Sequence, residues 1–285
     1  MTSPAIPLAP VAPPPSHLRP IPPRGLLRRV WDRIGWNVAL FLEIVAIIVI
    51  GQVMVSGLGL FNPEFVPPPS DIWGAFVRMA EKDVLVDNIW FSLSNFAIGF
   101  LLAAVVGILF GLALGTIRTV RTLAGPVVWI AYSTPRVALA PLIVMWLGFG
   151  PSSKIAVIFL MAVFPIIINV WVGASSVDQT LLRAGRVFGA SNVDLYRKVT
   201  LPYILPYTLT GLRLGIARGL VGVVIAEFIG SAAGIGYMIR LLSSEFDLAG
   251  ALALTLVLML AANVSMILLD LIRRRLAPWY REGAV

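Results

Sequence analysis

The chain has no cysteine and a single histidine, His17, among 285 residues. Disulfide frameworks and thiolate metal sites are therefore excluded, and one imidazole cannot form a histidine cluster around a metal. Charged residues are also scarce, at 13% of the chain, whereas soluble proteins have about a quarter. Apolar residues make up 59%. These proportions indicate an integral membrane protein.

Long apolar runs account for most of the chain. Crossing about 30 Å of hydrocarbon takes roughly 20 helical residues, and six runs reach that length, near residues 37–60, 88–116, 127–148, 153–173, 208–230 and 249–272. Tryptophans lie near the expected ends, as membrane interfaces favour. The sequence therefore predicts an all-α integral membrane protein in which residues 37–285 form one domain with six transmembrane helices.

The basic residues lie at the ends of these runs instead of forming one stripe, so the net charge of +8 indicates membrane orientation and not nucleic-acid binding. Six crossings place both termini on one side, where fifteen lysines and arginines fall, against four on the other. This bias predicts cytoplasmic termini in the plasma (inner) membrane, and a cytoplasmic segment 174–207. The four residues expected outside are Arg78, Lys82, Lys154 and Arg240.

Residues 1–36 differ from the rest of the chain. Residues 1–24 are rich in proline and lack a secretory signal, which predicts a disordered, polyproline-like cytoplasmic tail. Apolar and basic residues then alternate at helical spacing between 27 and 34, as in a short helix lying in the headgroup layer. The positive-inside rule, by which basic residues flank the cytoplasmic ends of spans, explains the arginines at 28, 29 and 33 equally well.

Residues 61–87 form an outer segment with a short helix expected after a Ser70 N-cap. We interpret its apolar face as buried in the membrane interface, and shielding of the pathway mouth or contact with a binding protein are the alternatives. The residues on that face are Ile72, Trp73, Phe76, Val77 and Ala80.

Glycines recur at every fourth position in the second and fifth runs, which lets helix backbones approach closely in lipid. We interpret the second stripe as packing within the chain, whereas the fifth could serve such packing or a subunit interface. The two stripes are Gly107, Gly111 and Gly115, and Gly211, Gly215 and Gly219.

Prolines at 135, 141 and 165 predict kinks in the third and fourth runs. These kinks either form part of a pathway wall or are tolerated by neighbouring helices.

Five polar residues inside the runs are candidates for the pathway or substrate site: Arg136, Asn169, Arg213, Arg218 and Glu227. An intramembrane charge costs on the order of 3 kcal/mol, so each must pair or face water. Arg213 and Glu227 lie about 21 Å apart along one helix, and Arg218 points away from Glu227, so their partners must lie elsewhere. The arginines could give the pathway a positive potential suited to a small anion. Alternatively, Arg213 and Arg218 snorkel or bond carbonyls.

The segment 174–207 contains Arg183-Ala184-Gly185, three residues, Gly189-Ala190, and then Val199-Thr200-Leu201-Pro202. We interpret it as a helical stretch that ends at Leu201-Pro202. This spacing resembles the EAA loop of ABC importer permeases, with Arg183 where that family has Glu. The resemblance implies that Arg183, Ala184, Gly185, Gly189, Ala190, Leu201 and Pro202 belong to a cytoplasmic coupling helix that docks on an ATPase subunit.

Further stretches are similar to the nitrate/sulfonate/taurine branch of these permeases: Pro69 to Trp73, Thr134-Pro135-Arg136, Phe164-Pro165 to Asn169, Gly211-Leu212-Arg213, Ala226-Glu227 and Gly234-Ile235-Gly236-Tyr237. The resemblance implies the type I ABC importer permease fold and transport by alternating access. It also implies a homodimer with two ATPase subunits, which bind ATP and Mg, and an extracytoplasmic substrate-binding protein. The implied solute is a sulfonate, taurine, nitrate, bicarbonate or a pyrimidine vitamin precursor.

The chain contains no Gly-x-x-x-x-Gly-Lys-Ser/Thr phosphate loop, so ATP hydrolysis must come from another polypeptide. We expect no catalytic residues, no metal and no cofactor in this chain. An intramembrane protease would need a His or two Asp within spans, and only Asp270 comes close. A proton-driven secondary transporter using Glu227 is the remaining alternative.

Overall fold

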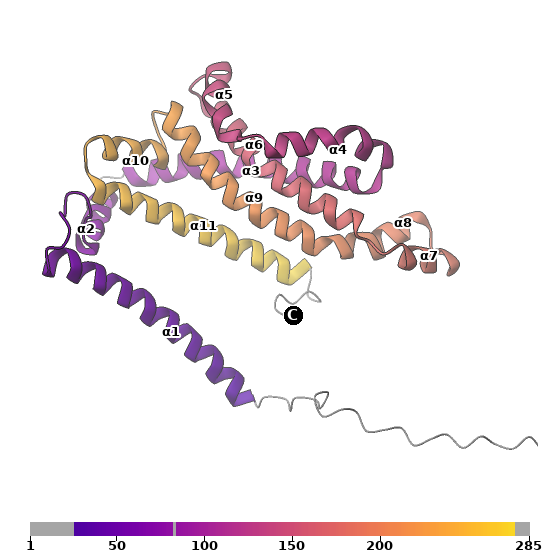
Figure 1. Ribbon diagram of the computed structural model, residues 1–285, viewed down its shortest axis with the longest axis horizontal. Helices are drawn as coiled ribbons and strands as arrows, with labels where there is room; N and C mark the ends of the chain where they lie inside the picture. The colour runs from indigo at the N-terminus through magenta and orange to yellow at the C-terminus, as the bar shows by residue number, and fades with distance from the viewer. Residues whose placement is uncertain (1–25, 82–83, 277–285) are drawn as a thin grey trace, which may run out of the picture. The chain divides into compact units, whose positions relative to one another are not determined.

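The computed structural model describes residues 26–81 and 84–276, and every regular element in these ranges is a helix (Figure 1). The chain divides into two compact units, residues 1–53 and 54–285, which are described separately. The expected proline-rich tail at 1–24, like Lys82, Trp279 and Arg281, lies outside the described residues.

In the first unit, α1 (Leu26–Gln52) is one continuous helix of 27 residues, about 40 Å long at 1.5 Å per residue. Its apolar part begins at Val38 and continues through the π-helical turn η2 (Val53–Gly57), giving a candidate span of 20 residues. The expected headgroup helix at 27–34 is therefore not a separate element. It extends the first span, because no proline or other break divides the two.

The second unit contains the remaining helices. In chain order, its first elements are α2 (Pro69–Ala80), α3 (Val84–Thr116), α4 (Arg118–Ser133), η3 (Arg136–Leu139), α5 (Ala140–Leu147) and α6 (Pro151–Ser175). They are followed by α7 (Gln179–Val187), α8 (Asn192–Leu195), η4 (Tyr196–Thr200), α9 (Leu201–Gly230), α10 (Ile235–Ser244) and α11 (Leu248–Leu276).

Among residues 26–81 and 84–276, four helical stretches are long and apolar enough to span a membrane, and the other two expected spans are bent pairs. Residues 118–133 and 136–147 meet at 85°, and residues 192–230 and 235–244 at 55°. Counting each pair as one span gives the six that the sequence predicts. The first break follows from Pro135, which restricts the preceding Thr134 to extended backbone (ψ 136°). Pro141 and Pro165 do not break their helices, since Pro141 lies in the first turn of α5 and Pro165 stays inside α6.

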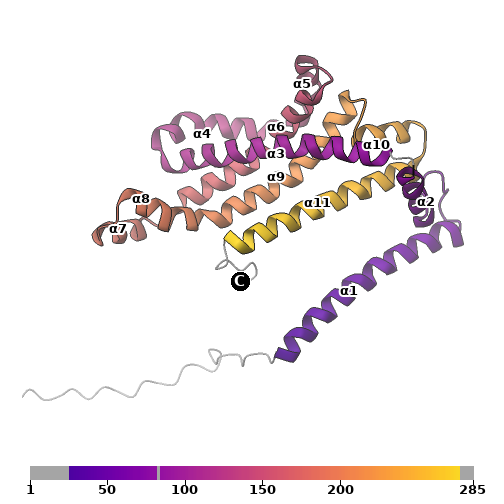
Figure 2. The same ribbon diagram turned by 180° about the vertical axis from the view of Figure 1, so that it is seen from behind.

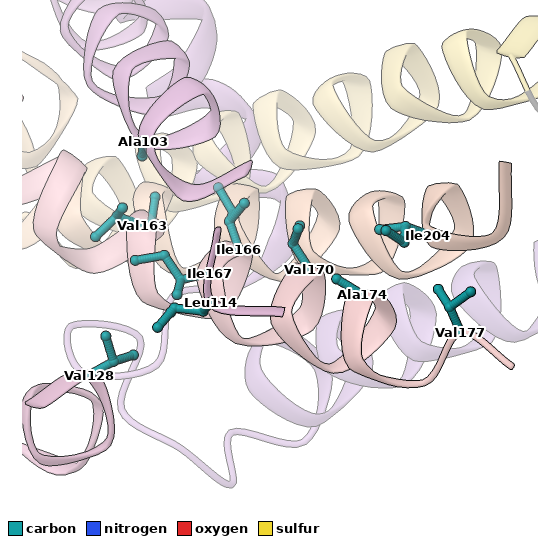
Figure 3. Packing of buried hydrophobic residues seen from close by; sticks show 11 residues of the cluster. Ala103, Leu114, Val128, Val163, Ile166, Ile167, Val170, Ala174, Val177 and Ile204 are labelled. Carbon is teal, nitrogen blue, oxygen red and sulfur yellow. The ribbon is translucent and has the colours of Figure 1, made fainter. Parts of the chain in front are cut away.

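Helix α6 packs along both α3 and α9, and these three helices form the centre of the second unit (Figure 1, Figure 2). The largest apolar cluster joins them to α4 (Figure 3). Its buried residues are Ala103 and Leu114 from α3, Val128 from α4, Ala162, Val163, Ile166, Ile167, Val170 and Ala174 from α6, Val177, and Ile204 from α9.

Both glycine stripes face α6, except that Gly219 lies nearest to Phe96 of α3. A Cβ at Gly111 would lie 2.7 Å from the carbonyl oxygen of Ile167, and one at Gly115 would lie 2.2 Å from the Cβ of Ala174. From α9, a Cβ at Gly215 would lie 2.9 Å from Ile166. The prediction that the second stripe packs within the chain is confirmed, and the stripe of the fifth run makes the same kind of contact.

The short helix α2 begins at Pro69, two residues before the start that a Ser70 N-cap predicts. Pro69 occupies its first turn, where a missing N–H and a fixed φ cost nothing. Ser70 is therefore inside the helix and not its N-cap, which is Pro68. Phe76 and Met79 pack on an apolar cluster of α3, α10 and α11 that includes Leu85, Ile235, Ile239, Ala251 and Leu254.

We predict that Gly111→Leu destabilises the protein by about 1 to 3 kcal/mol, because the added side chain must push α3 away from the α6 backbone. Thermal unfolding in detergent measures the effect. Val105→Leu is the matched control, since Val105 lies on the same helix and is exposed. Equal stability of the Gly111→Leu protein and the wild type would contradict the close approach of the two helices.

Candidate functional site

The segment 174–207 folds as a tight helical turn in which Gly189 is the essential backbone position. Helix α7 ends at Val187, and Gly189 adopts a left-handed conformation with φ of +79°. Its N–H donates to the carbonyl of Arg186, and the N–H of Ala190 donates to that of Gly185, both at 3.0 Å. These bonds form a Schellman motif, whose left-handed residue is normally glycine.

Contacts between α7 and α8 fix the angle of this turn. A Cβ at Gly185 would lie 2.4 Å from the side chain of Leu195, so α7 and α8 pack directly on each other at that point. Ser191 caps α8, accepting from the N–H of Asp194. The Asp194 carboxylate accepts from Lys198 at 2.7 Å and from the Ser191 hydroxyl at 2.6 Å. These partners lower the pKa of Asp194, which lies before the fifth apolar run, to about 2.

The Leu201-Pro202 pair does not end a helix, contrary to the interpretation of the sequence. Residues 192–230 form one helical stretch, with α8 passing through the π-helical turn η4 into α9. Pro202 is tolerated because it lies in the first turn of α9, after the wider π turn. The turn around Gly189 is therefore joined rigidly to the longest helix of the central group after α3.

The tip of this turn exposes apolar side chains beside basic ones. Val187, Phe188 and Val193 are 85%, 89% and 67% exposed. Exposed arginines flank them, at 183 and 186 on α7 and at 197 on η4. Large apolar side chains with this exposure outside an expected span indicate a surface that is covered by a protein partner.

A second candidate site lies where the third span breaks. The Arg136 guanidinium lies over the Tyr132 ring at 5.2 Å and over the Phe164 ring at 5.3 Å. Its Nη1 atom is buried and has no hydrogen-bond partner among the described residues. Arg218 is exposed on α9 and close enough to Arg136 for the two charges to repel. The short helix η3 and helix α9 thus place two guanidinium groups within electrostatic reach of each other. One of them has a buried donor without a hydrogen-bond partner among the described residues.

The other three pathway candidates lie apart from this pair. Arg213 bonds Asp270 of α11 at 3.1 Å, so its partner comes from another span, as the helix geometry requires. Asn169 donates to the carbonyl of Pro165 at 2.8 Å and faces Gly211. Glu227 is fully buried and accepts from the Ser92 hydroxyl at 2.7 Å.

Sequence reasoning missed Lys154, Ser92 and Asn88. The sequence predicts that Lys154 lies on the outer surface, because it stands at the start of an apolar run, but its side chain is fully buried. Its Nζ donates to the carbonyls of Phe149 and Gly230. No sequence spacing connects Lys154 with Gly230, 76 positions away, so only the packing of α6 on α9 reveals this partner.

Residues 103–282 match the family described as binding-protein-dependent transport system inner membrane component. The chain is 32% identical over 237 residues to the taurine transport system permease protein of Escherichia coli (strain K12), covering 80% of this chain and 85% of the relative. A Bacillus subtilis (strain 168) protein whose name assigns it to aliphatic sulfonates transport as a permease is 36% identical over 207 residues, 73% of this chain and 74% of the relative. The formylaminopyrimidine transport permease protein of Halalkalibacterium halodurans is 28% identical over 228 residues, 80% and 91% of the two chains.

We predict that Gly189→Ala weakens the turn by about 1 to 2 kcal/mol, the cost of a Cβ in left-handed backbone. Gly189→Asn should cost less, because asparagine tolerates this region. Protease sensitivity of residues 176–200 would report the change. Gly150→Ala is the control, since Gly150 has a negative φ of −75° and open space around it. If Ala and Asn at 189 behave alike, the left-handed conformation is not what the position requires.

Proposed function

Because the chain belongs to the binding-protein-dependent transport system inner membrane components, the permease subunits of ABC importers, we propose that it translocates a small anionic solute by alternating access. Sulfonates, taurine, nitrate and bicarbonate are the solutes of this kind. A permease of this family is a transport component, and a partner ATPase subunit hydrolyses ATP. Because the chain belongs to this family, a secondary transporter driven by protonation of Glu227 is no longer needed to explain transport.

The observation that supports an anionic solute is the arginine pair at the break of the third span. Two guanidinium groups repel each other when no anion lies between or beside them. The buried Nη1 of Arg136 is a donor without a protein partner among the described residues, and leaving such a donor unpaired is unfavourable. A sulfonate or carboxylate oxygen would satisfy it and would offset the repulsion from Arg218.

A pyrimidine vitamin precursor is the second candidate. One relative is named a formylaminopyrimidine transport permease protein, and the rings of Tyr132 and Phe164 next to Arg136 could stack on a planar solute. The two candidates differ in what Arg136 does. A charged oxyanion requires its positive charge, whereas a neutral ring needs the aromatic surface more.

The turn around Gly189 is the proposed coupling helix. Val187, Phe188 and Val193 would enter a groove of the ATPase subunit, and the flanking arginines would lie at the rim. Fifteen basic residues on the side of this turn support a cytoplasmic location. Because Lys154 is buried, only three basic residues of the outer segments are left to count on the other side. The excess of basic residues therefore keeps its direction, and we place both termini in the cytoplasm as part of this proposal.

The proposed assembly contains two copies of this chain, two ATPase subunits and an extracytoplasmic substrate-binding protein. ATP and Mg would be bound by the ATPase subunits. Two identical permease copies would place two arginine pairs around one shared pathway, which doubles the positive potential available to an incoming anion.

We predict that Arg136→Gln lowers substrate-stimulated ATPase activity of the reconstituted importer and raises the KM for an anionic substrate about tenfold or more, because a charge-assisted hydrogen bond is lost. Arg240→Gln is the matched control, since Arg240 also lies over an aromatic ring, Tyr237, at 5.3 Å. Unchanged stimulation by taurine or an alkanesulfonate would remove the case for an anion at this site. Stimulation by a neutral pyrimidine that persists in the Arg136→Gln variant would favour the second candidate, because a neutral ring does not require the positive charge.

We predict that Phe188→Ala weakens attachment of the ATPase subunit about tenfold or more, because an exposed aromatic residue at a docking tip is a typical binding hot spot. Co-purification of the two subunits measures attachment. Phe65→Ala is the control, as Phe65 is 64% exposed in the segment 61–87. Full attachment of the Phe188→Ala permease would contradict docking through this tip.

A further inference from the structure

The break between α9 and α10 is held by buried charge. Glu227 lies in the last turn of α9 and is fully buried. One carboxylate oxygen accepts from the Ser92 hydroxyl and the other from the N–H of Gly236, both at 2.7 Å. Gly234 has a φ of +107°, and a Cβ there would lie 2.4 Å from the carboxyl carbon of Glu227. The backbone therefore closes directly around the carboxylate.

Side chains of α3 bind the same helix end. The N–H of Gly234 donates to Asn88 Oδ1 at 2.6 Å, and the N–H of Ile235 donates to Ser92 Oγ at 2.8 Å. Together with Glu227, they satisfy three successive N–H groups at the start of α10, which no residue of α10 itself could bond. Ser92 accepts from Ile235 and donates to Glu227, so its hydroxyl has one orientation.

Lys154 performs the complementary role at the end of α9. Its ammonium donates to the carbonyl of Gly230, the last residue of α9, and to the carbonyl of Phe149 in the α5–α6 connection. Lys154 and Glu227 also attract each other electrostatically. A cation thus faces the negative end of one helix and an anion the positive start of the next, the arrangement that helix dipoles favour.

We propose that Lys154 and Glu227 are positioning residues that join the ends of α3, α6, α9 and α10 at this break into one rigid body. The distances between these four helix ends then stay the same throughout the transport cycle. Separating any member would leave a buried charge without its partner, which is strongly unfavourable. The inference rests on the proposed function in two respects: the orientation, which places this body on the extracytoplasmic side, and the transport cycle, which would move it.

The body is connected to the proposed coupling helix by α9 itself. Residues 201–230 extend about 45 Å at 1.5 Å per residue, from the π turn after α8 to Gly230. A displacement of the coupling helix would therefore reach the four joined helix ends as a movement of the whole body. The pathway would open at another boundary, and not between α3 and α10.

Spin labels test the rigid body directly, because the chain has no cysteine and two introduced ones are unambiguous. Trp90→Cys on α3 and Ser243→Cys on α10 are both exposed positions. Chains with a single label give the distances between the two permease copies. In the permease–ATPase complex of doubly labelled chains, we expect the additional α3–α10 distance within one copy to be narrow and to be the same without nucleotide and with ATP bound. A shift of several ångströms between the two states in the otherwise unmutated chain would overturn the proposal, whatever the variants do.

Glu227→Gln should broaden that distance and reduce ATP-driven uptake at least tenfold, while ATPase attachment and basal hydrolysis persist. The matched control is Glu245→Gln, an exposed glutamate after the end of α10. If Glu227→Gln leaves both the distance and the uptake unchanged, Glu227 is not a positioning residue. Failure of the variant to assemble leaves the label measurement on the unmutated chain as the deciding test.

A double variant examines the pairing. Lys154→Met leaves a buried carboxylate without its counter-charge, so Lys154→Met with Glu227→Gln should transport better than Lys154→Met alone. Effects that simply multiply would contradict the electrostatic link. Uptake by the labelled complex distinguishes failure of the proposed function from failure of the rigid-body proposal. The absence of any ATP-driven uptake counts against the proposed function. Uptake accompanied by a changing α3–α10 distance overturns only the rigid body.

Discussion

Close approach of three helix backbones is the constraint on which the second unit depends. In lipid, apolar side chains gain nothing from leaving water, so association must come from packing and hydrogen bonds. Glycines on α3 and α9 let both helices touch α6 at distances that no side chain would permit. Every other element of the unit is positioned from this centre, including the broken third span and the turn around Gly189.

Among the described residues, the two fully buried charges, Lys154 and Glu227, lie where the backbone is interrupted. At the end of α9, Lys154 and Glu227 compensate the exposed carbonyls and N–H groups of two helix ends. At the break after Pro135, Arg136 lies over two aromatic rings, and its buried Nη1 has no hydrogen-bond partner in the part of the chain that the structure describes. The first arrangement is satisfied and suits a fixed wall, whereas the second is incomplete and suits a site that receives a ligand.

The turn of residues 174–207 shows how a sequence spacing becomes a mechanical element. Gly189 supplies the left-handed residue, Gly185 admits Leu195, and Ser191 caps the next helix. The spacing between Gly189 and Pro202 predicts a helix that ends at Leu201-Pro202. The structure replaces the stop with a continuous helix, so that a force on the turn would be delivered along α9 instead of being absorbed in a loop.

Composition and apolar run length determined the membrane class and the six spans, because hydrocarbon thickness leaves few alternatives for a backbone that must bond to itself. Glycine periodicity determined that helices would pack closely, and the positions of Gly189 and Pro135 marked the turn and the first break. The tertiary structure alone decided which helix each glycine face meets, that Lys154 is buried, and that Arg136 and Arg218 lie together while Arg213 and Glu227 bind elsewhere. Those outcomes depend on contacts between residues far apart in the chain, and no local periodicity encodes which distant carbonyl or carboxylate a buried charge will reach.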